Sequence, residues 1–384
     1  MAFIGLGKIN SNLIPIIIGC IFCFLNRLLN QYEGTKLFEN VMLTNIFISF
    51  SDIFTIIPYI IFKIRSKKIY KPENKEVIPN ETKETKFEFL YEETYDIEDE
   101  VEGKGKFIVL IGVIFFVNYF IFVYIFALKT NTWIMYILFT SIFYYLFFKS
   151  KLYRHHYLSI VIILIIGLVI DFVEGNIQKD FTENFKLILL SFLRVILLSL
   201  NYVLIKYTME KKYASPYEIG FFNGLINLIL FIIGAVIDNF FIKKFEYKEY
   251  FDNFNGKELL VVLGLMITQF GIYISLFIID KKDTPCHIFI VFVFGQLAYY
   301  YKLTEISIVS IICLILILFF SLIFNEIIEL NFLGLSQNTR KNIINRANTE
   351  VEGALFVKNE ALEGNYETQK DGKEIEMENS SVES

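Results

Sequence analysis

The chain has 384 residues, of which 55% are hydrophobic and 17% aromatic, and its formal net charge is −5. Charged residues make up 20% of the chain, below the roughly 25% that is typical of soluble domains. No Lys/Arg block is dense enough, or interleaved enough with aromatic residues, to indicate nucleic-acid binding. All four cysteines lie in or beside apolar runs and are expected to pack as small apolar residues: Cys20, Cys23, Cys286 and Cys313.

Long apolar runs indicate a multi-pass helical membrane protein, because about 18 or more apolar residues can cross the hydrocarbon core as a helix. We count ten such runs, with nine or eleven as alternatives. Ten runs divide into two halves of five runs each. Because five is odd, a second half homologous to the first would enter the membrane from the opposite side, as in many secondary transporters. The predicted fold is therefore all-α, with ten transmembrane helices as two inverted five-helix repeats. The runs are approximately 12–30, 41–62, 107–128, 131–148, 157–173, 186–206, 217–238, 258–279, 285–301 and 305–324.

The chain divides into two predicted halves, 1–173 and 184–325, followed by a tail, 326–384. Within the first half, the loop 63–106 starts basic and ends acidic and has few large aliphatic residues, so we expect it to be mostly disordered. The tail carries ten acidic residues against three lysines from Thr349 onward. It is expected to be mostly disordered as well.

Lysine and arginine set the predicted orientation, because they prefer the cytoplasmic side of a membrane. With the N-terminus inside, twenty-two of these residues fall on the cytoplasmic side and nine on the other. Both termini, the loop 63–106 and the tail are therefore predicted to be cytoplasmic.

Two charged residues lie near the middle of predicted spans, where an ionised side chain costs about 2.5–3.5 kcal/mol. Asp52 lies in the second span and Arg194 in the sixth. Either they line a translocation path, with Arg194 open to an anionic solute, or they form a buried pair that sets helix packing. Asp52 is also a candidate proton carrier. The same choice between solute contact and packing applies to the amides within spans, of which the candidates are Asn118, Asn201, Asn223 and Gln269.

The junction between the sixth and seventh runs has the pattern of a helix start. Ser215 is a natural N-cap, Pro216 is tolerated in a first helical turn, and Glu218 would complement the helix dipole. The preceding segment, "KYTMEKK", is expected to be the hydrated end of the sixth span.

Three segments carry a resemblance to a known family: "KYTMEKKYASPYEIGFFNGL" (206–225), "LNRLLNQY" (25–32) and "NEIIELNFLGLSQNTRKNI" (325–343). They are similar to eukaryotic proteins of the drug/metabolite transporter superfamily, which are EamA-like and nucleotide-sugar transporter-like solute carriers, in a protist or fungal branch. The resemblance implies ten helices, cytoplasmic termini and alternating access between two halves. Characterised members move nucleotide sugars, sugar phosphates, nucleotides or other small metabolites.

The predicted function is secondary transport of a small polar, anionic metabolite, with a non-transporting membrane scaffold or receptor-like protein on the same fold as the alternative. The sequence contains no P-loop, HExxH motif or nucleophile elbow, so we expect no enzyme activity and no cofactor or metal. The expected partners are membrane lipid and a small-molecule solute, and no nucleic-acid partner is expected. A homodimer is compatible with the sequence. An endomembrane location (Golgi, ER or vesicle) is expected.

Overall fold

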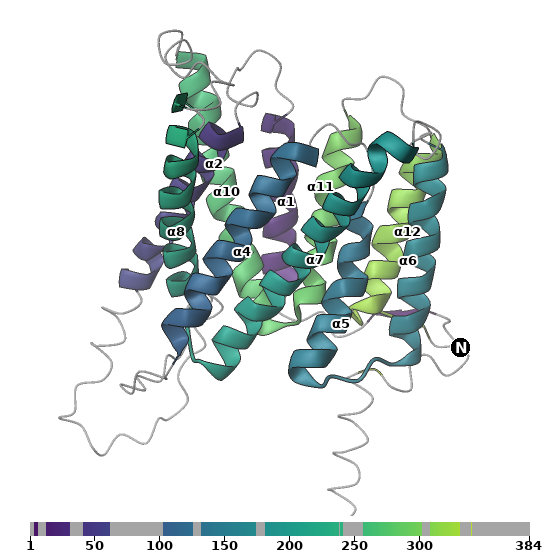
Figure 1. Cartoon of the computed structure of the whole chain (residues 1–384). Helices are drawn as coiled ribbons and strands as arrows, with labels where there is room; N and C mark the ends of the chain where they lie inside the picture. The colour runs from purple at the N-terminus through teal and green to yellow at the C-terminus, as the bar shows by residue number, and fades with distance from the viewer. Residues whose placement is uncertain are drawn as a thin grey trace, which may run out of the picture. The chain divides into compact units, whose positions relative to one another are not determined.

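The computed structural model describes residues 4–6, 13–30, 41–61, 103–125, 132–173, 181–237, 239–240, 256–301, 308–330 and 339. Most of the loop 63–106 and of the tail lies outside these residues, so their predicted disorder stays a prediction. The elements in chain order (Figure 1) are β1 Ile4–Leu6, α1 Leu13–Asn30, α2 Val41–Ile53, α4 Lys104–Ile125, η3 Thr132–Met135, α5 Tyr136–Phe148, α6 Arg154–Val173, α7 Phe181–Lys211, α8 Pro216–Ile237, α10 Gly256–Lys282, η5 Pro285–His287, α11 Ile288–Tyr301, α12 Ile308–Phe324 and β2 Ile328–Leu330.

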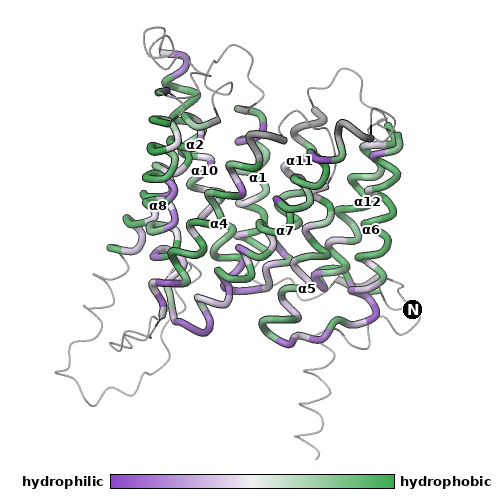
Figure 2. The backbone as a smooth tube through the Cα atoms, in the orientation of Figure 1, coloured by the Kyte–Doolittle hydropathy of each residue, from purple (hydrophilic) through white to green (hydrophobic). Residues whose placement is uncertain are grey.

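The helices have the length and composition of membrane spans. Among the described residues, six are long and apolar enough to cross a bilayer, and Figure 2 shows how apolar they are along their length. Four further apolar helices of 10–17 residues accompany them. The chain is therefore a multi-pass membrane protein with an all-α membrane part. The six long spans are Met42–Ile61, Lys104–Ile121, Arg154–Val173, Phe185–Lys211, Pro216–Ile237 and Gly256–Lys282, and the shorter helices are Leu13–Leu29, Thr132–Phe148, Pro285–Leu297 and Ile308–Phe324.

The distribution of polar and apolar side chains also fits a lipid environment. Large apolar side chains face outward, as Phe172 on α6 and Leu260 on α10 show with exposed fractions of 67% and 71%. Polar side chains lie inside instead, and Asn201 and Asn223 are completely buried. A soluble protein rarely exposes large contiguous apolar surface, whereas lipid-facing helices require it.

Each predicted apolar run coincides with a helix, but some boundaries differ. The largest difference is α7, which was predicted over 186–206 and runs from Phe181 to Lys211. The added segments, 181–185 and 207–211, are polar yet contain neither glycine nor proline. Nothing in them breaks a helix, so the helix continues beyond its apolar part.

The predicted start of α8 is confirmed. Pro216 is its first residue, and the Ser215 hydroxyl accepts a hydrogen bond from the Tyr217 N–H at 3.3 Å. Glu218 lies in the first turn, and its carboxylate pairs with the Lys104 ammonium of α4 at 2.7 Å. The N-terminal ends of α4 and α8 are thereby joined.

The helix α2 is interrupted directly after Asp52 and Ile53. Phe54 and Thr55 form a turn, and a helical segment resumes over 56–61. Pro58 accounts for the interruption, because a proline ring collides with the carbonyl four residues earlier, here that of Phe54. That carbonyl instead accepts a hydrogen bond from the Ile57 N–H at 3.0 Å.

The helices α2 and α8 pack closely because α8 presents two glycines to α2. A Cβ atom added to Gly224 would lie 2.7 Å from the Asp52 Cβ and 2.9 Å from the backbone nitrogen of Ile53. At Gly220 an added Cβ would lie 3.0 Å from the Thr55 hydroxyl. Small residues four apart allow this close approach in membranes.

The remaining helix contacts follow a regular scheme. The helix α1 packs against α10 and α11, and α7 packs against α4 and α5. Two further pairs are α4 with α8 and α10 with α2. Short 3₁₀ segments, η3 and η5, directly precede α5 and α11.

All of these helix contacts belong to one compact unit, Ile9–Leu152 with His156–Asn325. A second unit comprises Met1–Lys8, Tyr153–His155 and Glu326–Ser384. In it, β1 and β2 pair antiparallel, with Ile4 opposite Leu330, and His155 Nε2 lies 3.2 Å from a Glu326 carboxylate oxygen. These three-residue strands were not predicted from the sequence, and β2 lies near the start of the predicted tail.

Candidate functional site among the membrane helices

Asp52 is held at the interruption of α2. Its side chain is 2% exposed, and its backbone carbonyl accepts hydrogen bonds from the Thr55 N–H at 3.0 Å and the Thr55 hydroxyl at 2.7 Å. The Thr55 hydroxyl also lies 3.2 Å from the Tyr217 carbonyl of α8. The turn after Asp52 is therefore fixed both within α2 and against α8.

The Asp52 carboxyl lies beside tyrosines of two other helices. It interacts with the side chains of Ser51 and Tyr273, while its Oδ1 atom has no hydrogen-bond partner among the described residues. Tyr273, on α10, is 2% exposed. Its hydroxyl is 3.4 Å from that of Tyr119 on α4, and either hydroxyl can donate in this contact.

Two arginines share this neighbourhood. The Tyr119 hydroxyl lies within electrostatic range of Asp52, Arg194 and Arg27. Arg27 and Arg194 also lie within electrostatic range of each other. We call Asp52, Arg194, Arg27, Tyr119 and Tyr273 the charged cluster. Its members come from five helices: α2, α7, α1, α4 and α10.

Aromatic rings form one side of the charged cluster. The Phe115 ring lies 5.8 Å from Tyr119, 5.9 Å from Tyr273 and 6.2 Å from Tyr202, between ring centroids. The rings of Tyr136 on α5 and Phe292 on α11 each lie 6.2 Å from Tyr202. Aromatic faces of this kind can stack on a base or a sugar, and they also pack well as structure.

Two of the four predicted amides take part in hydrogen bonds with other side chains. Gln269 Oε1 is 3.5 Å from Asn26 Nδ2, which also donates to Thr268 at 3.0 Å, so α1 is joined to α10 there. The Asn223 carbonyl oxygens, main chain and side chain, accept from Asn227 Nδ2 at 2.8 and 3.0 Å. These contacts fit the packing alternative for Gln269, whereas Asn223 Nδ2 has no hydrogen-bond partner among the described residues.

The other two amides keep unused hydrogen-bonding atoms. Asn201 is completely buried, and neither its Oδ1 nor its Nδ2 has a partner in the described part of the chain. Asn118 is 3% exposed, and its Oδ1 is likewise without a partner there. Buried polar atoms of native proteins are nearly always satisfied, so water or a bound solute is expected beside them.

Sequence reasoning missed three contributors to the polar interior. Tyr119 could not be singled out among 23 tyrosines. Arg27 was not among the predicted site residues, yet it lies within electrostatic range of Tyr119 and Arg194. Lys206 was expected to lie in the hydrated end of the sixth span, but it is 3% exposed.

The helices and their charged interior define a class, that of multi-pass helical membrane proteins with ionisable groups buried between spans. No family model matches the chain, and no curated protein matches it either. The resemblance to the drug/metabolite transporter superfamily therefore stays a prediction from three short segments.

Proposed function

We propose that the chain is a secondary transporter of a small, polar, anionic metabolite. The charged cluster carries this proposal. Charged side chains within spans are costly and usually face a solute or water path. Here two arginines lie within range of each other, an arrangement that repulsion disfavours unless negative charge lies nearby. An anionic solute would supply that charge. We therefore assign Arg194 and Arg27 to solute binding.

We further propose ten spans arranged as two inverted repeats: α1, α2, α4, α5 and α6, followed by α7, α8, α10, α11 and α12. The helix contacts support this assignment, because the most extensive of them are conserved when the halves are exchanged. The pair α1–α10 becomes α7–α4, α1–α11 becomes α7–α5, α2–α10 becomes α8–α4, and α2–α8 maps onto itself. A 3₁₀ segment precedes the fourth helix of each half. Each half also supplies one arginine from its first helix.

We propose that the protein lies in an endomembrane. In the proposed orientation, the C-terminal ends of α7 and α10 and the N-terminal ends of α4 and α8 lie on its cytoplasmic side. The described lysines at these ends support it, namely Lys104, Lys106, Lys206, Lys211, Lys212, Lys281 and Lys282. The opposite ends of α7 and α10 carry Lys186 and Lys257. This bias agrees with the preference of basic residues for the cytoplasmic side.

A thermal-shift panel tests the proposed class of solute. Purified protein is melted with nucleotide sugars, nucleotides and sugar phosphates, because a ligand that binds the native state raises the apparent melting temperature. The hit is then tested for uptake into proteoliposomes. We expect at least one anion to stabilise the protein and to be taken up, and Arg194→Ala to lose both effects. Stabilisation without uptake would favour the receptor-like alternative.

A further inference from the structure

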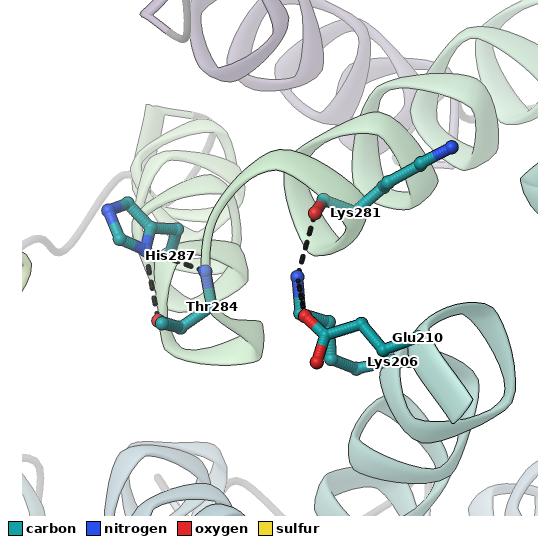
Figure 3. Close-up of polar contacts among 5 residues, drawn as sticks. All are labelled: Lys206, Glu210, Lys281, Thr284 and His287. Atoms are coloured by element: carbon teal, nitrogen blue, oxygen red, sulfur yellow. Dashed lines mark hydrogen bonds and ion pairs between the residues drawn. The ribbon is translucent and has the colours of Figure 1, made fainter. Parts of the chain in front are cut away.

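A buried lysine joins the C-terminal ends of α7 and α10. Lys206 is 3% exposed, and its ammonium donates to the Lys281 carbonyl at 2.7 Å and to Glu210 at 2.9 Å (Figure 3). The Lys281 carbonyl is among the last four of α10, which have no partner within the helix. The ammonium also complements the negative end of the helix dipole. We call this contact the Lys206 latch.

The chain leaves α10 through a tightly organised turn. The Thr284 N–H donates to His287 Nδ1 at 3.4 Å, and the Thr284 hydroxyl lies 3.1 Å from the same nitrogen (Figure 3). These contacts cap η5, in which Cys286 is 3% exposed and its sulfur lies 3.9 Å from the Ser141 hydroxyl of α5. Any separation of the ends of α7 and α10 would therefore expose a well-packed turn to water.

Asp280 lies beside the latch but outside its hydrogen bonds. Its side chain is completely buried, and neither carboxyl oxygen has a hydrogen-bond partner among the described residues. The charged groups that face it are Lys206 and Glu210 of α7. The other titratable side chains within electrostatic range are Tyr202 of α7, Tyr136 of α5 and Cys286 of η5.

We propose that Asp280 is a proton-binding site linked to the Lys206 latch, an inference that rests on the proposed transport function. The carboxyl holds its proton while α7 and α10 are joined as in this structure. When their ends separate, water enters, and the proton passes from Asp280 to that water, leaving a hydrated carboxylate.

The reason lies in the cost of burying charge. An ionised carboxylate without hydrogen bonds costs several kcal/mol inside a protein, even near a cation, whereas the neutral acid costs much less. The Lys206 ammonium favours the carboxylate electrostatically, but its hydrogen bonds go to Lys281 and Glu210. Burial without a hydrogen bond therefore still favours the neutral acid. Proton binding and latch closure therefore favour each other by linkage. Acidification is expected to close this end, and alkaline conditions to open it.

Cys286 supplies a native reporter for the test. Cys20, Cys23 and Cys313 are replaced by alanine, and the rate of Cys286 alkylation by N-ethylmaleimide is measured in mildly acidic and mildly alkaline buffer. The matched variant is Asp280→Asn, which cannot lose a proton and shows only the thiol's own pH dependence. One proton released on opening makes the parent-to-variant rate ratio rise by up to about tenfold per pH unit. Lys206→Met is expected to react fast in both buffers.

Equal pH profiles for the parent and Asp280→Asn would overturn the proton site. A slow Lys206→Met variant would overturn the latch. If Asp280→Asn does not fold, dicyclohexylcarbodiimide labelling of the unsubstituted chain replaces it, because this reagent modifies protonated carboxyls in apolar surroundings. Mass spectrometry should then find Asp280 modified at neutral pH and less so at alkaline pH, and no modification at either pH overturns the proposal. Neither readout needs a solute. Failure of the proton site can therefore be distinguished from failure of the transport function, which the uptake experiment tests separately.

Discussion

The close contact of α8 with α2 makes Gly224 a sensitive position. In Gly224→Ala the new methyl group would lie 2.7 Å from the Asp52 Cβ, 2.9 Å from the Ile53 nitrogen and 2.9 Å from the Ser49 carbonyl oxygen. Two of these neighbours are backbone atoms, so the helices themselves must move apart. Overpacking of this kind costs about 1–3 kcal/mol, offset in part by the roughly 0.5–1 kcal/mol by which alanine favours a helix. We expect a net loss of about 1–2 kcal/mol of stability.

Gly234 on the same helix is the matched control. A Cβ atom there would meet only the flexible side chain of Met42, at 3.4 Å from its sulfur. Gly234→Ala should therefore gain up to about 1 kcal/mol from helix propensity. Both variants are heated in detergent and followed by fluorescence-detected size exclusion. The apparent melting temperature should fall for Gly224→Ala and hold or rise for Gly234→Ala, and an unchanged Gly224→Ala variant would refute the packing described for α2 and α8.

Three further predictions concern separate parts of the chain. Ser215→Ala removes the cap of α8 and should cost about 1 kcal/mol of stability while leaving solute preference intact; a changed preference in a normally folded variant would show that the junction touches solute. Arg194→Lys keeps the charge but loses the planar donor pair, so uptake of the anion found in the thermal-shift panel should fall at normal expression, and unchanged uptake would remove Arg194 from the binding site. Asn80, in a glycosylation sequon outside the described residues, should carry no glycan in a eukaryotic host; an N-linked glycan there would falsify the proposed orientation.

The helices could be predicted from the sequence because their apolar runs are long and separated by polar islands. Asp52 and Arg194 could also be found, since a charge within an apolar run is conspicuous. Tyr119 could not, because its position depends on how α4 faces α10 and nothing local distinguishes it from other tyrosines. Asp280 could not be found for a similar reason: it is followed by Lys281, Lys282 and Asp283, a context typical of a hydrated helix end, and its burial depends on the packing of the helices.

The strands β1 and β2 were missed because three residues beside a long apolar helix give no pattern of their own. The two segments are separated by more than three hundred residues, Ile4 pairing with Leu330. No local signal predicts such a pairing. The close packing of α2 against α8 could not be predicted for a related reason. The role of Gly220 and Gly224 depends on which helix packs against them, and the local sequence does not specify that helix.

The contact scheme of the helices departs from symmetry between the proposed halves in two ways. The helix α11 packs against α12, whereas α5 and α6 have no equally close contact among the described residues. The other departure predicts a second conformation. The third helix of the second half, α10, packs against both α7 and α8, whereas its counterpart α4 has no equally close contact with α1 or α2 among the described residues. If the halves are equivalent, exchanging their conformations gives a state in which α4 closes onto α1 and α2 while α10 withdraws from α7. The distance between spin labels on α1 and α4 should then shorten while the distance between labels on α7 and α10 lengthens. Pulsed electron–electron double resonance measures both distances. Distances that change together, or not at all, would mean that the asymmetry is a fixed property of the bundle.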